Sequence, residues 1–556
     1  MIINILLRAF SVFWSIRTIK YILFYLYLWQ LKEYQFSRFI DHFRTFQGKR
    51  LFLNLLFFVK SILFILFCIG FFFLSSYKIN FFWLIFFVLF LIYLFEALFF
   101  LFNILKDRYK KPVFTFKVFF LFSFAVLTQI LYFFLIGRLT KSFFVFIFLL
   151  LLFDIFLPII VSLIVLFFQP FVVLIRNEII KKAIKRRNEM KNLTAVGITG
   201  SYAKTSVKEF LSVILSSKFK VLKTKKNENS EIGIARCILN HLTPDYEIFI
   251  AEMGAYKKGG IEFLSKIVKP KIGIITGVNE QHLALFKTMD NLISAEGGIE
   301  LVQNLPKEGT VILNKDNKII SEVFLSSKDK KQEERKKILV SANKKADLYA
   351  ENIKVEPEFI SFDIILKNGE RTSIKANLAG VFNVINLLLA SAAAIELGMS
   401  LREIKEGIKK IKINDGTIKI FKNQKGVVFL DSTYSSNPDG VLAGLEYLKL
   451  WPGKKIVIMP CLIELGKRSK EIHKQIGRKI GKICDLAIIT SKDRFDEIKK
   501  GVLEVGADED KIIFLKRNQE IINKINSFCV KNDVVLLEGR ISKEIVNALK
   551  NNLIYE

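Results

Sequence analysis

Hydrophobic residues divide the chain into two parts with different patterns. Before residue 192, long apolar runs fall at residues 9–29, 51–75, 81–104, 113–136 and 142–168. Each run is close to or above the roughly 20 residues that a helix needs to cross a bilayer. We therefore predict five membrane-spanning helices, of which the first is the least apolar because Arg17 and Lys20 interrupt it.

From residue 192 onward, short β-rich runs alternate with helical windows. Strand-like runs fall at 196–199, 248–252, 272–276, 310–313, 359–366 and 372–378, with helical windows at 206–215, 290–305 and 386–397. Such alternation is typical of a mostly parallel sheet with helices on both faces. The lysine-rich stretch 321–345 predicts a solvated surface excursion. A second α/β unit begins near residue 415, with candidate strands at 427–430, 455–459, 486–490, 511–515 and 534–537.

The charge pattern predicts the topology of the first part. It holds 41 of the 55 phenylalanines, and 24 Lys and Arg against 7 Asp and Glu. Its basic residues gather after the first, third and fifth runs, which places those loops and everything beyond residue 192 in the cytoplasm and the N-terminus outside. We therefore expect a multi-pass protein of the cytoplasmic membrane, with membrane lipids and no nucleic acid among its partners. The five cysteines have no metal-ligand or CxxC spacing.

Four charged residues lie inside the second to fifth apolar runs: Lys60, Glu96, Lys117 and Asp154. At membrane depth each is destabilising unless it is paired or lines a wet cavity. Two interpretations stay open. The residues form a polar pathway or a lipid-headgroup pocket, or they are snorkelling lysines and pairs between helices.

The stretch 197–206 (GITGSYAKTS) joins an apolar strand to a helix through a turn led by glycine. In this arrangement backbone N–H groups and a helix N-terminus face phosphate oxygens. A methyl group at Ala203, where such a loop prefers glycine, fits a negative φ but is strained by roughly 1 kcal/mol at a positive one. An ordinary strand–turn–helix corner is the alternative. The predicted nucleotide-binding residues are Gly200, Ser201, Tyr202, Ala203, Lys204, Thr205 and Ser206, with Lys204 on the phosphates and Thr205 on Mg²⁺.

Three more polar clusters follow at predicted strand ends. Glu252 ends one strand, where a carboxylate metal ligand would be placed in a sheet crevice. Asn279 and His282 follow the next strand, and the stretch from Asp431 opens a helix in the second α/β unit. Each alone also fits a structural role: a strand-capping glutamate, a hydrogen-bonded histidine and an Asn-Pro turn.

In this order and spacing, the clusters resemble the Mur ligases, the ATP-dependent amide-bond-forming enzymes of peptidoglycan synthesis. The resemblance covers residues 192–556 and includes TKKNENSEIG (224–233), AEMGA (251–255), TGVNEQHLALF (276–286), NKD (314–316), GVFNVIN (380–386), DSTYSSNP (431–438) and ELG (464–466) with His473. It implies a central ATP-binding P-loop domain (192–411) and a C-terminal Rossmann-like domain (412–556). These follow the membrane region with its basic cytoplasmic tail (1–191), which the apolar runs and the charge pattern predict.

The resemblance also implies a reaction and roles for single residues. ATP activates an acceptor carboxylate to an acyl phosphate, which an amine then attacks; D-alanyl-D-alanine is the implied amine and a peptidoglycan precursor the acceptor. By position, Lys204 holds the β/γ-phosphates, Thr205 and Glu252 hold one Mg²⁺, and His282 holds a second. Asn386 matches an adenine-side asparagine, and Asp431 matches the residue that meets the nucleotide from the C-terminal domain.

Several positions depart from the family pattern. Besides Ala203, these are Phe382 in place of a histidine, Ser432 in place of an aspartate, Thr417 in place of an arginine, and Glu538-Gly539-Arg540 in place of Lys-Gly-Ser. The family's metal-bridging carbamylated lysine is also missing. Glu296 lies near that point, and we hypothesise that its carboxylate supplies the missing negative oxygens at the metal.

The membrane runs stand where Mur ligases have a UDP-binding domain, so the acceptor is either UDP-linked or lipid-linked. Two other functions remain open: a catalytically degenerate membrane scaffold that binds nucleotide or wall precursors, and an amide ligase for a different acid. A transporter is a third class, which the lack of an evident internal repeat disfavours.

Overall fold

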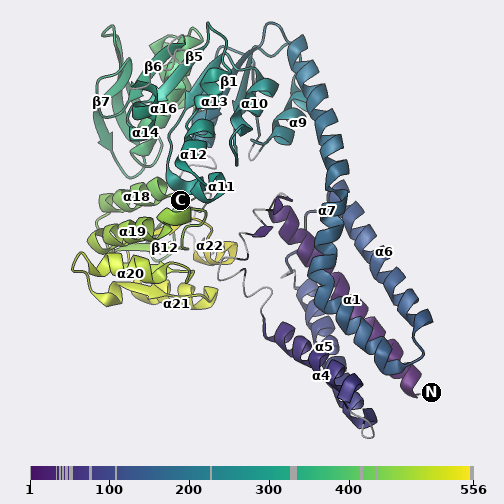
Figure 1. Ribbon diagram of the computed structural model, residues 1–556. Coiled ribbons are helices and arrows are strands. Elements are labelled where there is room, and N and C mark those ends of the chain that lie inside the picture. The colour runs from purple at the N-terminus through teal and green to yellow at the C-terminus, as the bar shows by residue number, and fades with distance from the viewer. Residues whose placement is uncertain are drawn as a thin grey trace. The chain divides into compact units, whose positions relative to one another are not determined.

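The computed structural model describes residues 2–550 except 33, 37–38, 41–42, 44–47, 49–53, 74–77, 107–108, 226–227, 326–334, 413–417 and 434–435. The chain forms two compact units, Met1–Ile175 and Arg176–Glu556 (Figure 1). The first is helical and the second is built of helices and strands.

Helices lie at all five predicted apolar runs. They are α1 (Ile2–Leu31), α4 (Leu55–Phe73), α5 (Lys78–Leu105), α6 (Phe116–Leu139) and α7 (Phe143–Glu189). By length and composition α5, α6 and α7 are able to cross a membrane, whereas the apolar part of α4 is shorter. Arg17 and Lys20 lie in the middle of α1, which is not among the three. The start of the second predicted run, 51–53, lies outside the described residues.

The buried charges of the helical unit pair with one another. Lys60 on α4 contacts Glu96 on α5 and lies 3.1 Å from Asp154 on α7, while Arg17 on α1 lies 3.3 Å from Glu96 and also contacts Asp154. Lys117 lies over a tyrosine ring, 3.4 Å from its centroid. The arrangement supports pairing between helices, the second interpretation of these residues.

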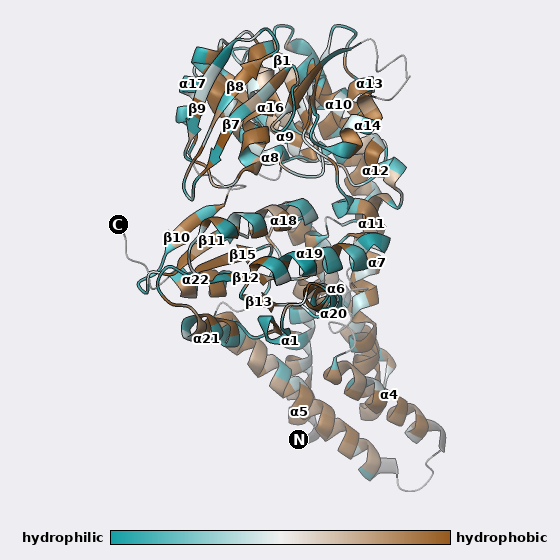
Figure 2. Cartoon of the chain, turned by 90° about the vertical axis from the view of Figure 1, so that its left-hand side faces the viewer, coloured by the Kyte–Doolittle hydropathy of each residue, from teal (hydrophilic) through white to brown (hydrophobic). Residues whose placement is uncertain are grey.

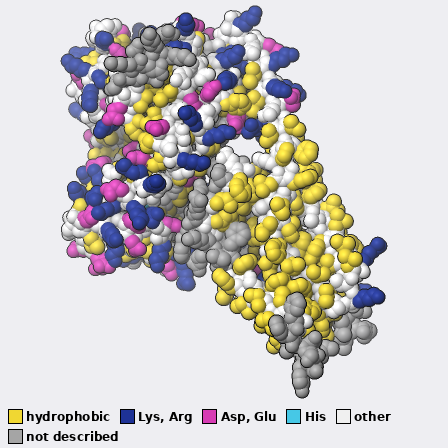
Figure 3. Space-filling view, in the orientation of Figure 1, with side chains coloured by type: hydrophobic (Ala, Val, Ile, Leu, Met, Phe, Trp, Pro, Cys, Tyr) yellow, Lys and Arg dark blue, Asp and Glu magenta, His cyan; other side chains and the backbone are white. Residues whose placement is uncertain are grey.

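The outer faces of this unit are apolar. Large hydrophobic side chains are exposed along α5, α6 and α7, as the yellow surface of Figure 3 and the brown helices of Figure 2 illustrate. Leu105 is 85% exposed and Phe116 is 87% exposed. Contiguous apolar surface of this kind is typical of a membrane or protein interaction site.

The second unit opens with a nine-stranded sheet in the order β2-β3-β1-β4-β5-β6-β7-β8-β9. Its strands are parallel from β2 to β7, and β8 and β9 continue it antiparallel. They are β1 (Thr194–Thr199), β2 (Val221–Lys223), β3 (Ile248–Glu252), β4 (Ile272–Ile275), β5 (Thr310–Asn314), β6 (Lys336–Ser341), β7 (Leu348–Val355), β8 (Ile360–Leu366) and β9 (Arg371–Ala376).

Helices cover both faces of this sheet, as predicted. One core lies under α8 (Lys204–Leu215), α16 (Phe382–Glu396) and α17 (Leu401–Lys409). The other lies under α9 (Glu231–His241), α10 (Gly260–Val268), α12 (Met289–Ala295), α13 (Ile299–Gln303) and α14 (Lys318–Leu325). Ile180 and Ala183, near the end of α7, join this second core.

The C-terminal sheet has six strands in the order β10-β11-β15-β12-β13-β14, with β10 antiparallel to its neighbour. The strands are β10 (Lys419–Lys422), β11 (Val428–Ser432), β12 (Lys455–Met459), β13 (Leu486–Ile489), β14 (Ile512–Phe514) and β15 (Val534–Glu538). Helices α18 (Pro438–Tyr447), α19 (Ser469–Ile483) and α20 (Phe495–Leu503) pack on one face, and α21 (Asn518–Phe528) and α22 (Lys543–Lys550) on the other.

Two predictions about single elements are wrong. The predicted surface excursion 321–345 contains the end of α14 and the whole of β6, because Ile338, Leu339 and Val340 pair with β5 inside a lysine-rich flank. The helical window 290–305 is two helices, since Gly298 between α12 and α13 has φ +87°. The strands β2, β7 and β10 were not predicted from the sequence.

Backbone packing fixes the turn between β1 and α8. Gly200 has φ +142°, and a Cβ there would lie 2.1 Å from Oγ1 of Thr276. The Ser201 N–H donates to the Gly277 carbonyl at 2.7 Å. Ala203, just before α8, has φ 60°. The alanine therefore has the left-handed conformation in which its methyl group is strained.

Replacing Ala203 with glycine is expected to remove this strain. Ala203→Gly should raise the free energy of unfolding of the second unit by about 1 kcal/mol, because glycine has no Cβ to clash with the backbone at positive φ. Chemical denaturation followed by circular dichroism measures the change. The control is Ala393→Gly in α16, where the same substitution removes a good helix former and should destabilise by about 1 kcal/mol. Equal effects of the two variants would contradict the assignment of strain.

Candidate active site

The side chains of the 200–206 loop lie at the carboxyl end of β1. The Lys204 ammonium contacts the Gly200 carbonyl of its own loop. The Tyr202 hydroxyl accepts a hydrogen bond from the Asn317 amide at 3.2 Å, and its backbone carbonyl accepts one from Thr276. Ser206 lies buried in the first turn of α8. The loop is therefore a closely held strand-to-helix turn, the local geometry of a phosphate cradle.

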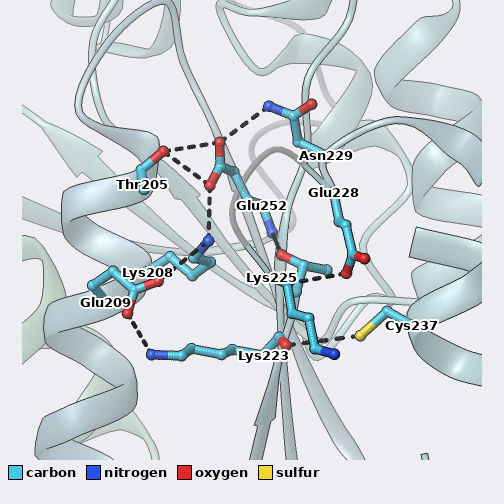
Figure 4. A network of polar contacts seen from close by, with 10 residues as sticks. Thr205, Lys208, Glu209, Lys223, Lys225, Glu228, Asn229, Cys237 and Glu252 are labelled. Atoms are coloured by element: carbon cyan, nitrogen blue, oxygen red, sulfur yellow. Dashed lines mark hydrogen bonds and ion pairs between the residues drawn. The ribbon is translucent and has the colours of Figure 1, made fainter. Parts of the chain in front are cut away.

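Glu252, at the end of β3, lies beside Thr205 (Figure 4). Its side chain is 4% exposed. The Thr205 hydroxyl lies 3.0 and 3.1 Å from the two carboxylate oxygens, and the Asn229 amide donates to Oε1 at 3.1 Å. Lys208 on α8 donates to Oε2 at 3.1 Å. Sequence reasoning missed Asn229 and Lys208.

The structure also brings Ser201, His282 and Glu296 together. Glu296 is 1% exposed; its Oε1 lies 2.8 Å from Nδ1 of His282, and its Oε2 accepts a hydrogen bond from Ser201 at 2.8 Å. Burial acts to raise the pKa of Glu296, but His282 and the Lys204 ammonium outweigh it and hold the pKa below its usual range. The contact at Nδ1 leaves Nε2 of His282 as the ring nitrogen available to a ligand.

These donors suit a divalent cation that binds together with phosphate. Within the described residues no group of three or more His, Cys, Asp and Glu side chains could hold a metal ion by itself. Mg²⁺ commonly binds through one or two carboxylates, with phosphate oxygens and water completing its shell. Thr205 with Glu252, and His282 with Glu296, match that requirement on each side of the loop.

The TGVNEQHLALF stretch also contacts the C-terminal domain. The Asn279 amide donates to Asn437 at 3.2 Å and to Asp439 at 2.9 Å. The Gln281 amide donates to the Ser436 carbonyl at 3.1 Å. The stretch that carries His282 therefore also joins the two sheets of the second unit.

Two predicted nucleotide-binding residues contact residues outside the loop. Asn386 is buried on α16, and its amide donates to Asn383 at 3.3 Å. Asp431, at the end of β11, accepts hydrogen bonds from the backbone and hydroxyl of Thr433. Their roles at a nucleotide stay predictions.

His473, which matches the family pattern, and the positions that depart from it have different local environments. His473 is fully buried, and its Nε2 accepts the Leu462 N–H at 2.9 Å, so this imidazole is a structural group. Glu538, at the end of β15, is 1% exposed, and its Oε2 has no hydrogen-bond partner among the described residues. Burial raises the pKa of Glu538 to about 8. Thr417 lies outside the described residues.

Comparison with known proteins relates both sheets to one family. A family model described as Mur ligase middle domain matches residues 198–394, and one described as Mur ligase, glutamate ligase domain matches residues 418–541. The UDP-N-acetylmuramoyl-tripeptide--D-alanyl-D-alanine ligase of Synechocystis sp. is 32% identical over 286 residues, which are 51% of this chain and 59% of that relative. The chain thus spans less than two thirds of this relative's length.

Solved structures have the same fold. MurF from Acinetobacter baumannii superimposes with a TM-score of 0.61 at 24% identity, covering 68% of this chain and 80% of that one. MurF ligase from Thermotoga maritima in complex with ADP superimposes with a TM-score of 0.58 at 22% identity, covering 68% and 84%. Because the two family models together match more than half of its residues, the chain belongs to the Mur ligase family.

Proposed function

We propose that this chain is a membrane-anchored, ATP-dependent amide ligase that adds D-alanyl-D-alanine to a peptidoglycan precursor. The observation that carries the proposal is the convergence of Lys204, Thr205 with Glu252, and His282 with Glu296 around one phosphate-type loop. The choice of D-alanyl-D-alanine as the amine substrate is based on the names of the relatives. The domain boundaries at 191/192 and 411/412 belong to the same proposal.

The loop and the start of α8 bind the phosphates of ATP in this proposal. Lys204 turns from the Gly200 carbonyl to the β/γ-phosphates, where its positive charge offsets the charge that develops during transfer. The backbone N–H groups at the start of α8 point toward the same anion. Asn386 contacts the adenine, and Asp431 contacts the nucleotide from the C-terminal domain.

Mg²⁺, when bound, would supply positive charge that offsets the negative charge of the phosphates. Thr205 and Glu252 would hold one ion. His282 would hold a second through Nε2, with Glu296 fixing the imidazole through Nδ1 and adding a negative charge. Glu296 thereby takes the place of the family's lysine carbamate.

The reaction forms one amide bond for each ATP consumed. A carboxylate oxygen of the acceptor attacks the γ-phosphorus and ADP leaves, giving an acyl phosphate. The amine of D-alanyl-D-alanine then attacks the acyl carbon, phosphate leaves, and the amine loses its proton. Protein groups hold the two substrates in line, which is the main contribution expected of such a site.

The helical unit anchors the ligase in the membrane in this proposal. The exposed apolar faces of α5, α6 and α7 support lipid contact, and the basic loops place the α/β unit in the cytoplasm. The acceptor is therefore handled at the cytoplasmic face, either UDP-linked or lipid-linked.

The full-length protein in detergent should release ADP in the presence of Mg²⁺ only when a muramoyl tripeptide and D-alanyl-D-alanine are both supplied. The measurement is coupled ADP release, with mass spectrometry of the product. Separate reactions with UDP-linked and undecaprenyl-linked tripeptide identify the acceptor. Nucleotide binding without turnover on either acceptor would indicate a degenerate scaffold, and turnover on a soluble non-wall acid would indicate a different ligase.

Removing the charge of Glu296 should weaken the second metal site. We expect Glu296→Gln to raise the Mg²⁺ concentration for half-maximal ATP turnover at least about 10-fold, as is typical when a metal-site histidine loses its carboxylate partner. Titration of ADP release with Mg²⁺ measures this.

Two further variants make the Glu296 experiment specific. Glu280→Gln, in the turn that carries His282 but paired with Arg468, should leave the Mg²⁺ dependence unchanged. Glu296→Lys should recover activity only as bicarbonate is raised, because a lysine needs CO₂ to become a carbamate. Unaltered Mg²⁺ dependence in Glu296→Gln would remove Glu296 from the site.

A further inference from the structure

Lys208 is a fully buried cation one helical turn beyond the phosphate-type loop (Figure 4). It follows Thr205 by three residues on α8, so both side chains share the helix face that meets the end of β3. Its ammonium lies 3.1 Å from Oε2 of Glu252 and 3.4 Å from Oε1 of Glu209. A buried position of the helix is thus occupied by a charged side chain that does not reach solvent.

Lys208 lies inside a chain of alternating charges. Glu209 contacts Lys223 through its other oxygen, so the series Glu252, Lys208, Glu209 and Lys223 is neutral in sum. A buried ammonium is tolerated when carboxylates compensate it in this way. The series ends at Glu252, the one member that also touches Thr205.

The two oxygens of Glu252 have different partners. Oε2 accepts from the positively charged Lys208, and Oε1 accepts from the neutral amide of Asn229. Thr205 lies within hydrogen-bond distance of both. An ammonium next to Oε2 repels a dication from that oxygen. Oε1 is therefore the better oxygen for a metal ion.

We infer that Lys208 is a positioning residue that makes Glu252 a one-oxygen ligand and thereby selects Mg²⁺ over Ca²⁺. Mg²⁺ requires near-ideal octahedral geometry at short distances, whereas Ca²⁺ accepts both oxygens of one carboxylate in a larger, flexible shell. Because Lys208 occupies Oε2 of Glu252, that oxygen is not available to a metal ion, and its loss disfavours Ca²⁺ more than Mg²⁺. The inference rests on the proposed Mg²⁺ site at Thr205 and Glu252.

The test measures metal preference directly on the full-length protein in detergent. Mn²⁺ is bound in the presence of ADP, followed by electron paramagnetic resonance, and displaced by Mg²⁺ or by Ca²⁺. Lys208→Met should reduce the preference for Mg²⁺ over Ca²⁺ about 10-fold, because both oxygens of Glu252 become available. The matched control is Lys223→Met, which removes a charge from the same series without touching Glu252 and should keep the wild-type preference.

An unchanged preference in folded Lys208→Met would overturn the inference and leave Lys208 a structural ion pair. A second measurement needs no Lys208 variant. Infrared difference spectra of the wild-type protein with Mg²⁺, assigned by comparison with Glu252→Gln, should show the wide band separation of a carboxylate bound through one oxygen. A two-oxygen signature with Mg²⁺ would overturn the inference. Failure of the wild-type protein to bind Mn²⁺ at all would refute the proposed metal site itself.

Discussion

Two carboxylates buried beside one strand-to-helix turn are the constraint on which the α/β unit depends. A buried carboxylate is stable only when donors surround it. The donors to Glu252 come from α8 and from Asn229, and those to Glu296 come from the 200–206 loop and the stretch after β4. The parallel register of β1 with β3 and β4 places these segments at one edge of the sheet. The strand order is therefore also what brings the hydrogen-bond donors to the two buried carboxylates.

The backbone of the turn between β1 and α8 also helps to place a hydrogen-bond donor beside a buried carboxylate. Gly200 approaches Thr276 so closely that no side chain fits there, and Ser201 is bound to the Gly277 carbonyl. This contact brings the Ser201 hydroxyl to Glu296. The left-handed Ala203 is the local strain that accompanies the arrangement. Strained backbone of this kind is held in place by surrounding contacts and gathers at functional sites. The tight turn thus positions Ser201 and also forms the phosphate cradle.

The sequence allowed the architecture of the α/β unit and half of the site to be predicted. Buried parallel strands read as short apolar runs, which placed Glu252 and His282 after two of the strands. The family resemblance was needed to give these two residues their expected roles. Lys208 was missed because lysine on a helix normally faces solvent, and here it occupies the buried face beside Leu211. Its signal was its spacing of three residues from Thr205. The strand β6 was missed because three apolar residues in a lysine-rich flank resemble a solvated loop.

In the helical unit, too, buried charges need compensating partners, and here the partners are other buried charges. Arg17, Lys60, Glu96 and Asp154 come from four helices and balance one another in number. Beside Glu296 the balancing charge includes the Lys204 ammonium, which in the proposed function turns to the phosphates of a bound ligand. The four charges between the helices need none. Each of the four charges lies beside an opposite one, and this is why pairing between helices accounts for these residues better than a pathway through the unit does.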